Sequence, residues 1–181
     1  KENTCEFWEA VIREEARDSQ QPEMDIVNRM TQMYRAMKEA DEAYDDTLTS
    51  HSGLSGKNGK KMADYAATHK CMCGEFGGAV MARAIKMAES NACMKRIVAA
   101  PTAGSCGVVP AILITYERMT NTSENDMVKA LFVAAGIGDV IARRASISGA
   151  RGGCQAEIGA SSAMAAGALA WLKSGSSHLI T

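Results

Sequence analysis

The sequence contains few aromatic residues, few prolines and no long apolar run. Of its 181 residues, 5% are aromatic and three are proline. No apolar run reaches the roughly 18 to 20 residues of a membrane span, and the charged start KENTCEFWEAVIREEARD contains no signal-peptide core. We therefore expect a cytoplasmic protein with no membrane partner.

An excess of charge of either sign is also lacking. The formal net charge is -1, with 46% hydrophobic and 23% charged residues. This balance gives no electrostatic reason to expect a nucleic-acid partner. A chain of this length can bury about 70% of its unfolded surface, so residues 1–181 are expected to form a single domain.

Six cysteines are present, but they lack the spacing of a disulfide scaffold or a zinc site. Without a secretory signal, reduced thiols are the better expectation. The C-x-C pair is not a zinc knuckle, and no histidine pair follows it. The six are Cys5, Cys71, Cys73, Cys93, Cys106 and Cys154.

Helical periodicity dominates the chain, and no strand alternates with the helices. Asn3 with Glu6, and Ser123 with Asp126, resemble capping boxes at two helix starts. Residues 96–100, RIVAA, have some strand character but stop at a proline. We predict an all-α bundle packed around a central small-residue helix at the end of the chain. The expected helices span residues 4–18, 22–44, 59–69, 74–91, 110–119, 124–144 and 153–172.

Two glycines interrupt the predicted helix at 124–144. Gly136 and Gly138 each cost about 1 kcal/mol of helix stability relative to alanine. Close approach of another backbone would explain them.

The longest expected loop, residues 50–60, reads SHSGLSGKNGK. Loops rich in glycine and serine can close over a ligand, because small side chains leave the polar backbone accessible. Composition alone leaves a ligand-binding loop and a flexible connector equally open.

Two other segments share one design, APTAGSCGVVPAIL at 100–113 and ISGARGGCQAEIG at 147–159. Each places glycines and a cysteine where a loop becomes a helix. The first amides of a helix attract anions and lower the pKa of a nearby thiol. An alternative interpretation is that Cys106 and Cys154 are small residues buried in tight turns.

These two segments, together with SGLSGKNGKKMADY and AAGIGDVIARRASISGARGG, resemble the alpha chain of the bacterial iron-sulfur-dependent L-serine dehydratases. The similarity runs in the same order over most of residues 20–172. It implies conversion of L-serine to pyruvate and ammonia by a [4Fe-4S] cluster, without pyridoxal phosphate. It also implies three thiolate ligands and one open iron that acts as a Lewis acid on the serine hydroxyl.

By position in GGCQAE, Cys154 matches the first cluster ligand of that family. The family's other two ligating cysteines lie in a later segment, and no cysteine follows Cys154 here. We therefore expect a chain truncated at its C-terminus, with loss of the chemistry as the alternative. The resemblance also implies a separate beta chain, without which the isolated chain should be inactive.

The remaining site residues are expected at the glycine-rich segments. His51 is a candidate base, and Cys106 would line the substrate pocket. Glu157 would orient Gln155 or act as a first-turn carboxylate favoured by the helix dipole. The substrate carboxylate would be held by Ser52, Gly53, Ser55, Thr102, Gly104, Ser105 and Gly107.

Two other functions fit the same residues. A helical module could bind serine or another small anion at the two turns without performing a reaction. Alternatively, Cys106 or Cys154 could be a nucleophile in acyl or thiol chemistry.

Overall fold

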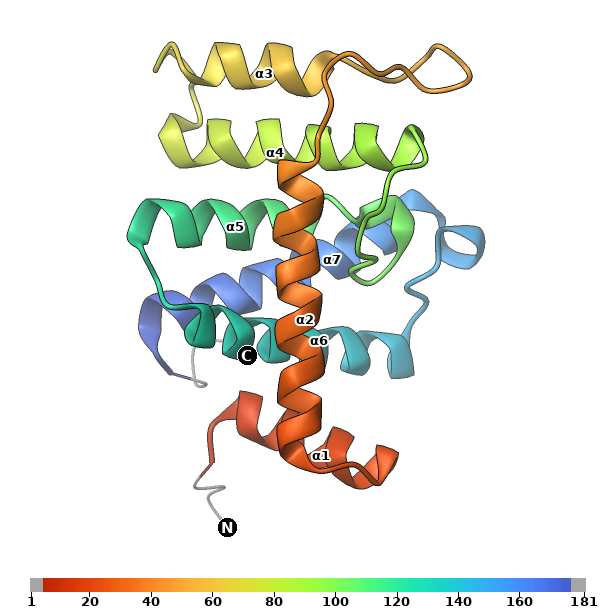
Figure 1. The fold of residues 1–181 in the computed structure, drawn as a ribbon. Helices are drawn as coiled ribbons and strands as arrows, with labels where there is room; N and C mark the ends of the chain where they lie inside the picture. The colour runs from red at the N-terminus through yellow and green to blue at the C-terminus, as the bar shows by residue number, and fades with distance from the viewer. Residues whose placement is uncertain (1–4, 177–181) are drawn as a thin grey trace.

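The computed structural model describes residues 5–176, which form helices joined by turns (Figure 1). The predicted all-α class is confirmed, because no strand occurs within the described range. Residues 96–100 form no regular secondary structure, so their strand character was misleading. The elements are α1(Phe7–Ser19), α2(Glu23–Glu42), α3(Asn58–Ala66), α4(Gly74–Ala92), the 3-10 turn η1(Ala103–Ser105), α5(Val108–Thr120), α6(Glu124–Arg144) and α7(Gly149–Ser174).

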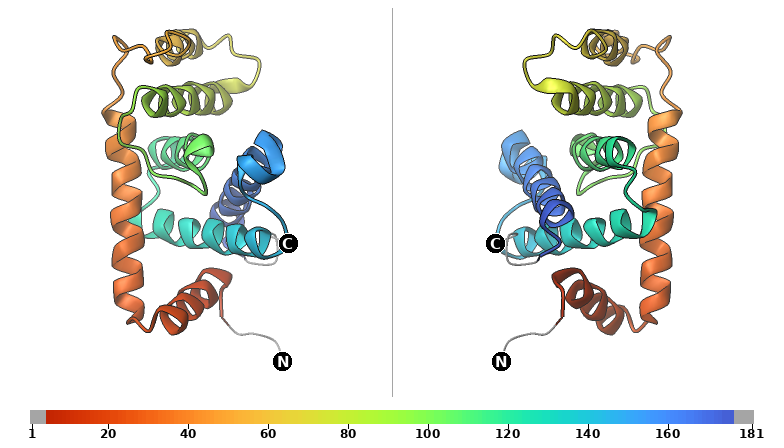
Figure 2. Two further views of the ribbon diagram at one scale, coloured as in Figure 1. Left: turned by 90° about the vertical axis from the view of Figure 1, so that its right-hand side faces the viewer. Right: turned by 90° about the vertical axis from the view of Figure 1, so that its left-hand side faces the viewer.

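The long helix α2 crosses the other helices at a steep angle (Figure 1). It contacts α1, α4, α5 and α6. Helix α7 lies on the side opposite to α2 and packs against α5 and α6 (Figure 2). Helices α3 and α4 pack together at the end of the molecule farthest from α1 (Figure 1). Helices α5 and α6 thus lie between α2 and α7.

Of the two expected capping boxes, one is present only as a side-chain N-cap, without the reciprocal bond, and the other is displaced. The Asp126 amide donates to Ser123 Oγ at 3.2 Å at the start of α6. At α1 the box is formed by Glu6 and Glu9, with the Glu6 amide 3.2 Å from Glu9 Oε2. The helix therefore begins at Phe7, and Asn3 lies outside the described residues.

The core is formed mainly by the buried faces of α2, α5, α6 and α7. Burying each large apolar side chain contributes about 1.5–3 kcal/mol, so this face-to-face packing supplies most of the stabilisation. The largest side chains that are completely or almost completely buried include Tyr34, Met87, Val109, Leu113, Ile114, Met127 and Val133.

Helix α7 contains a break at Gly153, where φ is 75° and ψ is 174°. A left-handed φ of this kind favours glycine, and the regular helix starts at Cys154. Beyond the break, one face of the small-residue helix is buried through Ala160, Met164 and Ala168. The opposite face remains exposed, Ala163 among its residues.

Gly136 and Gly138 are close to other helices, but their neighbours are side chains and not the backbone that we expected. A Cβ at Gly136 would lie 2.5 Å from Val11 Cγ2 and 2.8 Å from Phe7 Cζ in α1. A Cβ at Gly138 would lie 2.9 Å from Met164 Sδ in α7. The two glycines therefore let α1 and α7 approach α6.

We expect Gly136→Val to lower the free energy of unfolding by about 1–3 kcal/mol, because the added side chain overpacks the contact with α1. Gly159 provides the matched control, since it is helical and a Cβ there would meet nothing within 4 Å. Gly159→Ala should raise stability by roughly 0.5–1 kcal/mol through helix propensity. Urea unfolding measures both changes. A Gly136→Val protein as stable as wild type would contradict the packing described here.

Candidate functional site

The first glycine-cysteine segment forms a tight turn that leads into α5. Thr102 begins η1, and its Oγ1 lies 2.9 Å from Ser105 Oγ in a reciprocal cap. Ser105 and Cys106 are almost completely buried, whereas Ala103 and Gly104 are exposed. The turn thus presents backbone to solvent while its two small polar side chains face inward.

Helix α4 holds this turn in place. The Asn91 side-chain amide donates to the Ala103 carbonyl at 3.1 Å. A Cβ at Gly107 would lie 2.6 Å from the Ala84 carbonyl oxygen, a backbone atom that has little freedom to move. Only glycine therefore allows the start of α5 to pack this closely against α4.

Cys106 does not have the lowered pKa that we expected of a thiol at a helix start. Burial raises its pKa most strongly, a backbone hydrogen bond opposes this to a smaller extent, and the negative charge of Glu157 adds a further increase. Its Sγ faces the Met87 carbonyl at 3.9 Å. The buried neutral thiol is poorly suited to nucleophilic attack.

The second segment begins α7 and leaves its cysteine accessible. Gly149 to Gly152 form a first helical turn after Ser148, and Gly153 breaks it. Cys154 and Gln155 are exposed. Cys154 therefore lies at the start of the regular helix, where an external group can reach its sulfur.

Glu157 brings the two turns together. Its Oε1 accepts a hydrogen bond from Thr102 Oγ1, across the contact between α7 and η1. A Cβ at Gly104 would lie 2.6 Å from Glu157 Oε2, and a Cβ at Gly149 would lie 2.9 Å from the same oxygen. A side chain at either glycine would therefore displace this carboxylate from its present position.

This contact alters the role expected for part of the first turn. We predicted that Thr102, Gly104, Ser105 and Gly107 would hold the substrate carboxylate, but the carboxylate that meets Thr102 and Gly104 belongs to the protein. A second carboxylate at the same point would be repelled by it. Sequence analysis gave Glu157 only a minor role, because nothing in GGCQAE indicates a partner 55 residues away.

The glycine-rich loop closes on itself. The Ser50 amide donates to the Ser55 carbonyl at 2.7 Å, and the Gly53 amide to the Ser50 carbonyl at 2.8 Å. His51, Ser52 and Gly53 are exposed, and Ser55 is half-buried. No hydrogen bond among residues 5–176 joins this loop directly to the Thr102 turn.

A buried carboxylate that sequence analysis missed anchors the end of this loop. Glu89 of α4 accepts hydrogen bonds from the amides of Asn58 at 2.7 Å and Gly59 at 3.0 Å, the first residues of α3. The Tyr44 hydroxyl donates to it at 2.7 Å. Glu89 is 4% exposed and lies two residues before Asn91, so the last turn of α4 supports both glycine-rich segments.

These contacts set the ionisation of Glu89. Burial is the largest effect and opposes ionisation, but the hydrogen bonds from Tyr44, Gly59 and Asn58 together outweigh it and lower the pKa. Tyr44 responds in the opposite direction, since burial and the Glu89 carboxylate raise its pKa to about 12. The pair is therefore a neutral phenol that donates to a carboxylate at neutral pH.

Within the described residues, no group of three His, Cys, Asp or Glu side chains could hold a metal ion. Cys5, Cys71, Cys73 and Cys93 are free and do not gather around Cys154. The possible metal ligands among these residues therefore do not form a complete cluster site, and Cys154 offers one accessible thiol.

Among residues 5–176, no helix combines the length and the apolar character needed to span a membrane.

We expect Glu89→Gln to lower the free energy of unfolding at pH 7 by about 1–3 kcal/mol, because the amide has one oxygen for three donors. The folded pKa of Glu89 is lowered, so its contribution is present above the unfolded pKa of about 4.3 and is lost as the pH falls through the folded value. The difference between variant and wild type should therefore shrink in acid. Chemical unfolding from pH 7 to 3 measures it. Exposed Glu15 gives the control Glu15→Gln. A difference that stays constant with pH would contradict this assignment.

Comparisons with known proteins identify the family. A family described as "Serine dehydratase alpha chain" matches residues 2–181. The chain is 35% identical over 175 residues to "Probable L-serine dehydratase, alpha chain" of Bacillus subtilis, covering 97% of this chain and 58% of that protein.

Two further relatives have related names. The identity is 35% over 170 residues to "L-serine dehydratase, alpha chain" of Peptoniphilus asaccharolyticus, covering 93% of this chain and 58% of the relative. It is 46% over 94 residues to "L-serine dehydratase 1" of Escherichia coli, covering 51% and 21%. The chain thus spans less than two thirds of the length of these relatives. Because the family match covers nearly every residue, the chain belongs to the serine dehydratase alpha-chain family.

Proposed function

We propose that this chain contributes the alpha-chain part of an L-serine dehydratase, which converts L-serine to pyruvate and ammonia. Family membership supports the reaction class. The observation that carries the proposal is the contact between Glu157 and Thr102, which joins the two glycine-cysteine turns into one partly exposed site. The proposed site therefore contains an accessible thiol, a carboxylate and two hydroxyl groups.

We propose Cys154 as one ligand of a [4Fe-4S] cluster. It is exposed, and the glycines before it leave room for a bulky anionic group beside the backbone. Amides at a helix start stabilise such an anion by hydrogen bonding. The other ligands must come from outside residues 5–176. The chemistry that such a cluster supplies when bound is Lewis-acid assistance to departure of the β-hydroxyl group.

We propose that Glu157 binds the α-ammonium group of serine. Its charge attracts a cation at the position where we had expected the substrate carboxylate, and the hydrogen bond from Thr102 fixes its orientation. Because serine carries its carboxylate and ammonium groups on one carbon, the donors for the carboxylate must lie beside Glu157. The loop at residues 50–56, which contains Ser52, Gly53 and Ser55, lies at the level of α3, on the other side of α4 from the Thr102 turn (Figure 1), and is therefore not assigned this role.

We propose that a separate beta chain completes the site. The Bacillus and Peptoniphilus relatives are named as alpha chains, and the ligand set on this chain is incomplete. The exposed start of α7 is where such a partner would have to approach Cys154. The described residues alone should therefore not turn over serine.

The cluster assignment is tested by Cys154→Ser in the complete assembly of alpha and beta chains, reconstituted with iron and sulfide without air. We expect the bound iron and the pyruvate-forming activity to be lost. Cys73→Ser is the matched control, because Cys73 is also an exposed thiol beside a helix start. Unchanged iron in the Cys154→Ser protein would remove the assignment, and absence of iron from the wild type would favour a binding module without catalysis.

The ammonium assignment is tested by Glu157→Gln in the same assembly. A hydrogen bond to a charged group contributes about 1.5–3 kcal/mol, so we expect KM for L-serine to rise by roughly 10-fold to 100-fold with a smaller change in kcat. The iron content should stay at the wild-type level, which separates this effect from disruption of the turns.

Two further variants complete that test. Glu157→Asp keeps the charge and should recover part of the affinity for L-serine. Glu23→Gln removes an exposed carboxylate from the first turn of α2 and should change neither KM nor kcat. A Glu157→Gln enzyme whose kcat falls while KM stays constant would contradict ammonium binding.

A further inference from the structure

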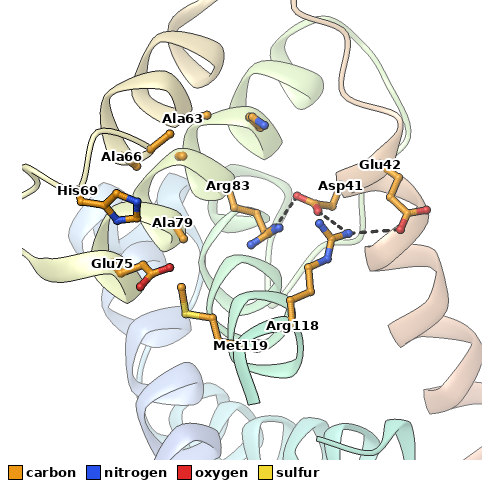
Figure 3. A pocket seen from close by; sticks show the side chains of 13 residues that line it. Asp41, Glu42, Ala63, Ala66, His69, Glu75, Ala79, Arg83, Arg118 and Met119 are labelled. Carbon is orange, nitrogen blue, oxygen red and sulfur yellow. Dashed lines mark hydrogen bonds and ion pairs between the residues drawn. The ribbon is translucent and has the colours of Figure 1, made fainter. Parts of the chain in front are cut away.

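Helix α4 separates the candidate site from a second cavity. Ala84, Met87 and Asn91 contact the Thr102 turn from one face of α4. The opposite face, which includes Ala79 and Arg83, lines a cavity of about 350 Å³. This cavity lies between α3, α4, α5 and the end of α2 (Figure 3). The proposed dehydratase site uses none of its residues.

One end of the cavity carries two arginines that are paired with two carboxylates. Arg83 Nε lies 2.8 Å from Asp41 Oδ1, and Arg118 lies 3.3 Å from Asp41 Oδ2. Arg118 also pairs with Glu42 at 3.3 Å. Lys86 also lines the cavity, but its Nζ lies over the Tyr44 ring, 5.3 Å from the ring centroid. At this end two guanidinium groups therefore face two carboxylates.

The guanidinium of Arg83 is held rigidly at this end. Besides the ion pair with Asp41, its Nη1 donates a hydrogen bond to Thr115 Oγ1 at 2.6 Å. Asp41 is 5% exposed and the Arg83 side chain 15% exposed. The remaining terminal nitrogen of Arg83 makes no hydrogen bond to a described residue. A planar guanidinium fixed in this way is suited to bind a carboxylate.

The other end of the cavity is acidic. Glu75 and His69 lie on the opposite side from Arg118 and Asp41, with Ala79 between the two groups (Figure 3). Glu75 forms no ion pair within residues 5–176. The walls between the two ends consist of small side chains, which leave the space open. They include Ala63, Ala66, Ala67, Ala79 and Ala82.

We propose that this cavity binds a small molecule that carries both a carboxylate and an ammonium group. The carboxylate binds at Arg83 and Arg118, and the ammonium group binds at Glu75. The separation of opposite charges across an alanine-walled space matches such a zwitterion, and the volume is at the lower end for small-molecule sites, which are roughly 300–1,000 Å³. The ligand class is therefore that of a free amino acid.

The test uses the complete alpha chain labelled at alanine and methionine methyl groups and titrated with L-alanine. L-alanine has no hydroxyl group to lose, and the measurement needs neither cluster nor beta chain, so its failure leaves the proposed dehydratase function standing. We expect saturable NMR shifts at the cavity methyls of Ala66, Ala79 and Met119, with a Kd on the order of 1 mM. Ala103 and Met87 report on the Thr102 turn.

Matched variants identify the two ends. Glu75→Gln should lower the affinity for L-alanine at least fivefold and leave the affinity for acetate unchanged. Ala79→Leu should abolish the binding of both ligands by filling the cavity. Glu23→Gln is the control on a distant exposed carboxylate. Shifts confined to Ala103 and Met87 would overturn the proposal. So would shifts that do not saturate, equal binding of acetate and L-alanine, or affinities that neither cavity variant changes.

Discussion

The candidate site depends on one carboxylate placed between two turns that are distant in the sequence. Glu157 accepts a hydrogen bond from Thr102 and fills the space that side chains at Gly104 and Gly149 would need. Without this contact, α7 and η1 would have no polar link at the point where both are exposed. Burial raises the pKa of Cys106, with a smaller contribution from the Glu157 charge, so the two cysteines of the repeated design differ in kind. Cys106 is a buried neutral thiol, whereas Cys154 is accessible.

Helix α4 acts as the common support for the polar parts of the molecule. Through Glu89 it holds the start of α3, and through Asn91 it holds the turn before α5. Its other face lines the charged cavity around Arg83. A ligand in that cavity would contact α4 directly, whereas a substrate at the turns would contact residues that pack on the opposite face of the same helix.

The sequence predicted the fold class and most helix positions, because apolar periodicity reports burial on one face. The cap at Ser123 was also predictable, since its partner is three residues away. Contacts between residues that are distant in the sequence could not be predicted. In the sequence, Glu89 and Glu157 look like ordinary helix carboxylates, because their partners are far away in the chain. The start of the last regular helix at about residue 153 was predicted, but the short helical turn from Gly149 to Gly152 before it was not.

The account requires Thr102 and Glu157 to act as one unit in the reaction. A double-mutant cycle with Thr102→Val and Glu157→Gln, measured as kcat/KM for L-serine in the complete assembly, tests this most directly. If the hydroxyl acts only by orienting the carboxylate, the double variant should lose little more than Glu157→Gln alone, with a coupling energy in the range of about 0.5–3 kcal/mol. If the fold losses of kcat/KM in the two single variants multiply to give the loss in the double variant, the two residues act independently, which would contradict the account.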